Sequence, residues 1–93
     1  MKNLTLFYLE GCPYCRHARK AMDELKVENP VYGSIGVQWI NESKEAALAE
    51  RYDYYYVPAV FLEKDKLFEA SPAMGYEEIK LGMRQALDTA LTR

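Results

Sequence analysis

The chain has 93 residues, 49% of them apolar, which allows one compact domain with its own core and leaves no room for a second. Its 12 lysine and arginine residues are scattered among 14 aspartate and glutamate residues. The formal net charge of -2 therefore offers no basic surface for nucleic acid or anionic lipid. No stretch approaches the roughly 20 apolar residues of a membrane span, and residues 1–9 lack the apolar segment of a secretory signal. We therefore expect a cytoplasmic protein.

The first two predicted elements are a buried strand and an amphipathic helix. Residues 2–9 form an apolar, aromatic-rich run that ends at Gly11, which is typical of a strand buried on both faces. The pattern that follows predicts a helix of about fifteen residues, which ends before Asn29-Pro30 because the residue preceding a proline is disfavoured in the helical region. Apolar residues on its inner face recur every three or four positions: Ala18, Ala21, Met22 and Leu25.

A second strand and a short second helix follow. Residues 35–40 alternate as a strand does, and we assign Trp39 to the core. A helix between two strands favours a parallel, right-handed β-α-β unit. Asn41 or Ser43 can cap a helix over residues 44–52, whose expected inner face consists of Ala47, Leu48 and Tyr52.

The last part of the chain predicts a hairpin and a final helix. Residues 59–62 are the most strand-like run, and Pro58 lies at its start because proline cannot donate a hydrogen bond to a sheet. Residues 63–66 are a polar turn, and residues 67–70 return as the antiparallel partner. A helix begins near Tyr76, with a buried stripe of Ile79, Met83, Ala86, Leu87, Ala90 and Leu91. The order β-α-β-α-β-β-α predicts an α/β fold with a four-stranded mixed sheet flanked by three helices.

The stretch Cys12-Pro13-Tyr14-Cys15 stands where the first strand pattern gives way to the helical one. If Cys12 is the last residue before the helix, its sulfur lies among unpaired backbone N–H groups at the positive end of the helix dipole, where a thiolate is favoured. Pro13 suits the first helical position. Cys15, one helical turn on, can attack a mixed disulfide formed on Cys12. A strand, a C-x-x-C pair and a helix together indicate a thiol–disulfide exchange centre.

Other uses of the two cysteines remain open. They can be small buried hydrophobic residues or form a structural disulfide, although a bridge across so short a loop removes little entropy from the unfolded chain. A zinc ion or an iron–sulfur cluster needs more ligands than two cysteines and His17 supply, so only a dimer that shares ligands can hold one. His17 itself is expected at the surface.

Two side chains near the cysteines have candidate roles. Arg16 lies four residues past Cys12, and helical side chains lean toward the N-terminus, so its guanidinium can approach and stabilise the thiolate. The alternative is a solvated charge on an exposed helix face. Among the tyrosines from 52 to 56, most are expected to pack in the core or on a strand, and only Tyr56, beside Val57, is a candidate for the substrate site.

With these residues in view, the chain resembles a small thioredoxin-fold protein, and Cys12-Pro13-Tyr14-Cys15 is the active-site tetrapeptide of dithiol glutaredoxins. The resemblance covers nearly the whole chain, including Val57-Pro58 before the third strand. It implies a cis peptide bond at that dipeptide, and it implies that the backbone of Val57 pairs with a bound peptide or glutathione as an added strand. The substrate groove that it implies is lined by Pro13, Tyr14, Tyr56, Val57, Pro58 and Gly75.

Three positions depart from the glutaredoxin pattern. Leu9 stands where glutaredoxins usually carry a lysine, Tyr56 where a threonine is common, and Gly75-Tyr76 where two glycines stand. A single glycine followed by an aromatic residue is more similar to the small glutaredoxin-like redoxins that thioredoxin reductase recharges. Leu6 stands where thioredoxins keep a buried acidic residue, and in this position the chain again resembles glutaredoxins. The resemblance therefore leaves the reductant open.

The sequence predicts a monomeric thiol–disulfide oxidoreductase that reduces protein disulfides or glutathione mixed disulfides through Cys12 and Cys15. We expect no bound cofactor and no metal in a monomer. Glutathione or thioredoxin reductase is the expected source of electrons. The alternative from another class is a dimeric module that binds a metal or an iron–sulfur cluster.

Overall fold

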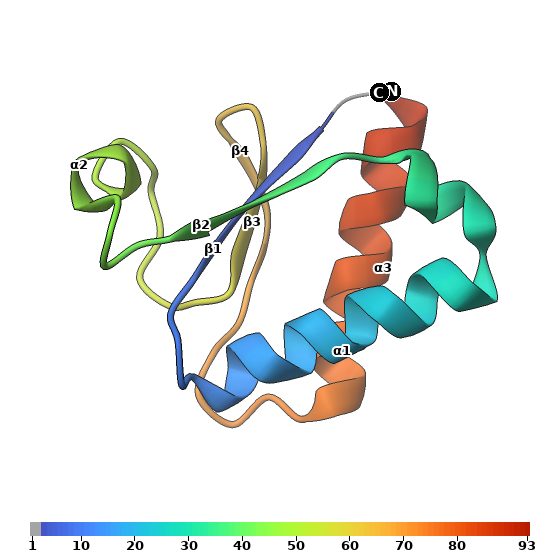
Figure 1. Ribbon diagram of the computed structural model, residues 1–93, viewed down its shortest axis with the longest axis horizontal. Coiled ribbons are helices and arrows are strands. Elements are labelled where there is room, and N and C mark those ends of the chain that lie inside the picture. Colours follow the sequence, from blue (N-terminus) through green and yellow to red (C-terminus); the bar gives the residue numbers. More distant parts are fainter. Residues whose placement is uncertain (1–2) are drawn as a thin grey trace.

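The computed structural model describes residues 3–93 and carries the predicted elements in the predicted order (Figure 1). The predicted elements are β1 (Leu4–Tyr8), α1 (Pro13–Glu28), β2 (Val37–Asn41), α2 (Ala46–Ala49), β3 (Ala59–Leu62), β4 (Asp65–Glu69) and α3 (Tyr76–Thr92). A 3-10 helix that was not predicted, η1 (Pro30–Ser34), lies between α1 and β2. Lys2, at the start of the first predicted strand, lies outside the described residues. No helix within residues 3–93 combines the length and apolar character that crossing a membrane requires.

The four strands form one mixed sheet in the order β2-β1-β3-β4. β1 runs parallel to β2, with Leu4 opposite Val37, and antiparallel to β3, with Leu6 opposite Val60. The helix α1 connects the two parallel strands, as predicted. Because of these directions, the end of β1 lies beside the end of β2 and the beginning of β3. The cysteine loop after β1 therefore meets the Val57-Pro58 loop at one end of the sheet (Figure 1).

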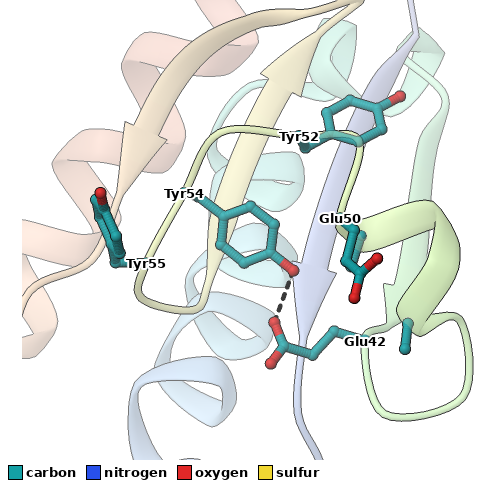
Figure 2. A pocket seen from close by; sticks show the side chains of 7 residues that line it. Glu42, Glu50, Tyr52, Tyr54 and Tyr55 are labelled. Atoms are coloured by element: carbon teal, nitrogen blue, oxygen red, sulfur yellow. Dashed lines mark hydrogen bonds between the residues drawn. The ribbon is translucent and has the colours of Figure 1, made fainter.

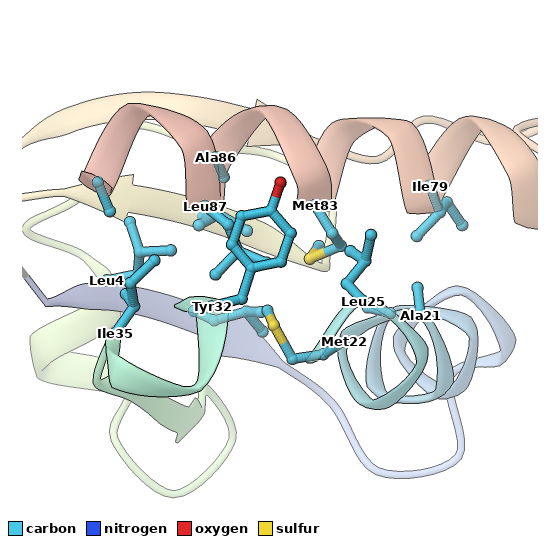
Figure 3. Close-up of a cluster of buried hydrophobic side chains, with 14 of the residues drawn as sticks. Leu4, Ala21, Met22, Leu25, Tyr32, Ile35, Ile79, Met83, Ala86 and Leu87 are labelled. Carbon is cyan, nitrogen blue, oxygen red and sulfur yellow. The ribbon is translucent and has the colours of Figure 1, made fainter. Parts of the chain in front are cut away.

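The main core lies between the sheet and the helices α1 and α3, which pack against each other. Figure 3 shows Met22 of α1, Met83 of α3 and Tyr32 of η1 meeting in this core. The predicted inner faces of both helices are buried, except that Leu91 is half-buried at the edge. The fully buried members include Leu4, Leu6, Ala18, Ala21, Leu25, Ile79, Ala86, Leu87 and Ala90.

A smaller aromatic cluster covers the opposite face of the sheet. Phe7 of β1 and Phe61 of β3 are buried there. The ring of Tyr52 lies 4.8 Å from that of Phe7, and the ring of Tyr54 stacks on the same phenylalanine at 5.0 Å. These two tyrosines come from the loop between α2 and β3, so the cluster anchors the loop that leads to Val57-Pro58.

The second helix is much shorter than predicted. α2 covers four residues because the chain before it forms a turn, in which the Asn41 side chain accepts hydrogen bonds from the backbone N–H and the hydroxyl of Ser43. Asn41 and Ser43 are thus partners in a turn and not helix caps. Ala47, expected on the inner face, is exposed, whereas Leu48 and Tyr52 are half-buried against the aromatic cluster.

Two strand boundaries and the burial of one core residue also differ from the prediction. β4 begins at Asp65, inside the predicted turn, because Glu63 adopts a φ of 57° and lets the chain reverse between Leu62 and Asp65. Ile35 is buried but lies outside β2. Trp39 packs against the main core, as assigned, but is only half-buried, because β2 is an edge strand; the Arg19 guanidinium lies over its ring, with Cζ 4.2 Å from the ring centroid.

Candidate active site

Cys12 is the residue immediately before α1, as the sequence predicts. Its backbone is extended, with φ of -78° and ψ of 121°, and Pro13 opens the helix. Gly11 has a φ of 78°, a left-handed conformation that favours glycine and lets the chain turn from β1 into the helix. The Cys12 thiol is partly exposed and donates a hydrogen bond to the carbonyl oxygen of Val57, with 3.9 Å between sulfur and oxygen. A half-exposed sulfur therefore stands at the positive end of a helix dipole.

Cys15, in the first turn of α1, is only 5% exposed. Burial, the Cys12 sulfur and the negative charge of Glu42 raise the pKa of Cys15 from 9.0 to about 12. A backbone hydrogen bond at Leu9 opposes these effects only in part. Cys15 thus stays protonated in the neutral range, while Cys12 is the accessible sulfur.

The Val57-Pro58 peptide bond is cis, as the resemblance implies. Pro58 is buried, and its carbonyl accepts the N–H of Ala70 at 3.0 Å. The loop before it is fixed by Glu69 of β4, whose Oε2 accepts the backbone N–H groups of Tyr55 and Tyr56 at 2.5 and 2.7 Å. Glu69 was not singled out in the sequence, where it is one acidic residue of a strand with no motif around it. The structure makes it the residue that positions the Val57-Pro58 loop.

Replacement of Glu69 by alanine is expected to destabilise the protein by about 1–2 kcal/mol at neutral pH, since two loop N–H groups lose a charged acceptor. Burial alone would raise the pKa of Glu69, but hydrogen bonds from Lys66, Tyr56 and Tyr55 outweigh it and lower the pKa below 4.5. The carboxylate's contribution is therefore complete above pH 4.5 and is lost as the pH falls through the lowered value. Urea unfolding of both proteins at pH 7 and pH 3 measures this difference.

Lys66→Ala is the matched control for this prediction. The Lys66 ammonium lies 2.9 Å from the other carboxylate oxygen of Glu69, Oε1. Removal of this ammonium leaves both loop N–H groups bonded to Oε2. We expect an effect below about 1 kcal/mol, as for other surface ion pairs. Amide hydrogen exchange at Tyr55 and Tyr56 should accelerate in the alanine variant of Glu69 and not in that of Lys66. Equal exchange in the two variants would contradict the positioning role.

Tyr14 connects the cysteine pair with the loop before α3. Its hydroxyl accepts the backbone N–H of Ala73 at 3.3 Å, and Ala73 has a φ of 89°. Tyr14 lies in the first turn of α1 and is half-buried against the main core. Gly75 ends the loop as the N-cap residue of α3, and its N–H donates to Glu78 at 3.0 Å.

Arg16 and His17 take up contacts that the sequence did not indicate. The Arg16 side chain is exposed, and its Nη1 donates to the carbonyl oxygen of Gly11 at 3.1 Å, one residue before Cys12. The surface position predicted for His17 is wrong, because its ring meets Tyr76 edge-on at 5.6 Å and its Nδ1 is buried without a partner within residues 3–93. Within the same residues, no group of three or more His, Cys, Asp or Glu side chains is placed to hold a metal ion.

The remaining predicted groove residues differ in exposure. Tyr56 is 50% exposed beside Val57, and Tyr55 is 87% exposed. Tyr52 and Tyr54 are half-buried in the aromatic cluster, as expected of most residues in this tyrosine run. The structure thus brings Cys12, Val57 and Tyr56 to one end of the sheet.

Comparison with known proteins gives a family and a fold. The Glutaredoxin family model matches residues 4–68, which is more than half of the chain. No curated protein matches the chain significantly. Among solved structures, the chain is similar to a thioredoxin-like protein from Clostridium perfringens, with 24% identity and a TM-score of 0.59 over 97% of this chain and 71% of that one.

Two further structures have the same fold. A mutant thioredoxin from Halobacterium salinarum NRC-1 is 21% identical, with a TM-score of 0.55 over 89% of this chain and 73% of that one. A malarial protein is 18% identical, with a TM-score of 0.59 over 90% of this chain and 94% of that one. At these identities the likenesses establish a thioredoxin-like α/β fold and nothing finer. The family match, which spans both cysteines and the Val57-Pro58 loop, adds the classification: the chain belongs to the glutaredoxin family.

Proposed function

We propose that the protein is a thiol–disulfide oxidoreductase in which Cys12 is the nucleophile and Cys15 the resolving thiol. The observation that carries the proposal is the contrast between the two sulfurs. Cys12 is accessible at the N-terminus of α1, where unpaired amide groups and the helix dipole favour a negative sulfur. Cys15 is buried one turn further on and holds its proton.

The reaction has two exchange steps. In the first, the Cys12 thiolate attacks one sulfur of the substrate disulfide, whose S–S bond breaks; a mixed disulfide forms on Cys12 and the other substrate sulfur leaves as a thiolate. In the second, Cys15 releases its proton and attacks the Cys12 sulfur. The remaining substrate sulfur leaves and takes up a proton, and the protein keeps a Cys12–Cys15 disulfide. The substrate has then gained two electrons and the protein has lost two. A thiol reductant or a flavoprotein reductase supplies two new electrons that reduce the Cys12–Cys15 disulfide.

The surroundings of Cys15 support this order of steps. Part of what raises the pKa of Cys15 comes from the Cys12 sulfur, through a hydrogen bond and through its charge. When Cys12 is in a mixed disulfide it carries no charge, so that part disappears and the pKa of Cys15 falls. The resolving thiol therefore becomes easier to ionise once it has a bond to attack.

The substrate lies along the Val57-Pro58 loop in this proposal. The backbone of Val57 offers a strand-like partner next to Cys12, and Tyr56 presents a half-exposed ring beside it. Pro13, Tyr14, Pro58 and Gly75 form the remaining sides of the groove. Arg16 supports the Cys12 turn through the Gly11 carbonyl and adds a positive charge near the thiolate.

The proposal extends to the setting in which the protein works. A dithiol that reduces disulfides needs a reducing compartment, so we place the protein in the cytoplasm, as a single-domain monomer without a bound cofactor. Metal analysis and sizing of anaerobically purified protein test this part. A dimer that carries zinc or iron in stoichiometric amount would favour the metal-binding alternative instead.

The source of electrons can be tested directly. Leu9 and Glu10 occupy the approach to Cys12 where a lysine would meet a carboxylate of glutathione, so we expect faster recycling by thioredoxin reductase than by glutathione. Reduction of insulin disulfides is measured with NADPH and thioredoxin reductase, with NADPH, glutathione and glutathione reductase, and with dithiothreitol. Leu9→Lys is the matched variant, and it should raise turnover with glutathione alone.

Each outcome of this assay decides something. Catalysed insulin reduction in any arm supports the oxidoreductase, and its absence in all three, dithiothreitol included, would refute it. Efficient turnover with glutathione that Leu9→Lys does not improve would show that a cation at position 9 is unnecessary, and would make glutathione the reductant.

A further inference from the structure

A cavity of about 420 Å³ lies between α2 and the loop that leads to β3 (Figure 2). This volume falls within the roughly 300–1,000 Å³ of typical ligand pockets. The Tyr54 hydroxyl donates to Glu42 at 2.6 Å across it, and Figure 2 shows the Glu50 carboxylate extended toward the same space. Tyr55, whose side chain is exposed, also borders the cavity.

The cavity is lined by two carboxylates, those of Glu42 and Glu50, that form no ion pair within residues 3–93. Lys64 lies against one wall, because its ammonium is 4.1 Å from the ring centroid of the lining residue Tyr52, but it donates to the Arg51 carbonyl at 2.8 Å and to neither carboxylate. Two carboxylates beside aromatic rings are the chemistry that recognises an organic cation.

The cavity adjoins the thiol site through two connections. Tyr55 is two residues before Val57, whose carbonyl accepts the hydrogen bond from Cys12. Glu42 follows β2, and its N–H donates to the carbonyl of Tyr8 at the end of β1 at 3.0 Å. The charge of Glu42 is also felt at Cys15, where it contributes to the raised pKa. A ligand in the cavity is therefore close to an exchanging disulfide.

We propose that this cavity binds a cationic side chain, arginine above all, of the polypeptide whose disulfide Cys12 attacks. The inference rests on the proposed function and adds a substrate class to it. A polypeptide that pairs with the backbone of Val57 continues past Tyr55, which brings a basic residue near the substrate cysteine to the carboxylates. A planar guanidinium can stack on a tyrosine ring while it donates hydrogen bonds to both glutamates. Glutathione, which carries two carboxylates of its own, is disfavoured there.

The test uses matched peptide disulfides. Each peptide has a single cysteine that is joined as a mixed disulfide to 5-thio-2-nitrobenzoate. Within the set, arginine or its neutral isostere citrulline is placed at one position at a time, from three residues before the cysteine to three after it. The reduced full-length protein releases the coloured thiolate, and the rate of this release gives the second-order rate constant for each peptide. We expect arginine to exceed citrulline by about tenfold at one position, the size of effect that one hydrogen bond to a charged group gives. Glu50→Gln and Glu42→Gln should reduce that ratio to about one.

Glu45→Gln is the matched control, because it removes the same charge from the neighbouring N-cap of α2 but not from the cavity. It should keep the arginine preference. An equal loss in all three variants would mean a general charge effect and overturn the inference. A ratio near one at every position would also overturn it, while the thiolate release itself would still support the exchange reaction. If no peptide reacts at all, the proposed function fails and the inference falls with it.

Discussion

Replacing Cys12 by serine should lower disulfide reductase activity by about a thousandfold or more, because a serine hydroxyl is not ionised at neutral pH and the attacking sulfur is gone. The expectation follows from the position of Cys12 at the start of α1, where its partly exposed sulfur is the one that a substrate can reach. The measurement is the rate of insulin reduction with dithiothreitol at fixed protein concentration. Circular dichroism should show an unchanged fold, since the two side chains have similar size.

Cys15→Ser separates the two roles. This variant keeps the nucleophile, so it should form the mixed disulfide and then stop, because nothing resolves it. Mass spectrometry of the variant after mixing with a peptide disulfide should show one peptide bound through Cys12. Retention of activity in Cys12→Ser, or a peptide trapped on Cys15 when Cys12 is replaced, would reverse the assignment of the two sulfurs.

The cysteine site could be predicted because its determinants are local in the sequence. Gly11 permits the turn, Pro13 suits a helix start, and the spacing brings Cys15 one turn after Cys12. These features act within a few residues of each other, so tertiary packing did not alter them. The same holds for the periodic faces of α1 and α3, whose apolar stripes point at the core where the pattern placed them.

The contacts that hold the surrounding loops could not be predicted, because they join residues far apart in the chain. Glu69 meets the N–H of Tyr56 across 13 residues, and Tyr14 meets Ala73 across 59. No periodicity or motif marks such pairs. His17 was misplaced for the same reason, since only the fold reveals that Tyr76 packs against it.

The sequence predicted the wrong boundaries for α2 and β4, where local preference and tertiary context differ. Residues 44–52 look helical, but the turn in which Asn41 bonds Ser43 delays the start of the helix, and only Ala46–Ala49 form one. Asp65 and Lys66 look like part of a turn, yet β4 is an edge strand, where polar side chains are tolerated and useful. In both places the sequence pattern indicated the right element with the wrong length.

Iodoacetamide should modify Cys12 far faster than Cys15 in the reduced protein. With its pKa raised to about 12, only about one Cys15 in ten thousand is ionised at pH 8, against about one in ten for a thiol at 9.0. Burial slows the reagent further, so we expect Cys15 labelling at least about a thousandfold slower than that of an unstructured peptide thiol. Peptide mapping by mass spectrometry after timed quenching gives both rates.

The pH dependence of Cys15 labelling tests the cause of its raised pKa. In a Cys12→Ala background, labelling should rise with pH across a range shifted below that of the native pair, because the hydrogen bond and charge of Cys12 are removed while burial remains. Adding Glu42→Gln should shift the profile further in the same direction, since a nearby negative charge disfavours the thiolate. A profile unchanged by both substitutions would leave burial as the whole cause, and the mixed disulfide on Cys12 would then do nothing to activate the resolving thiol.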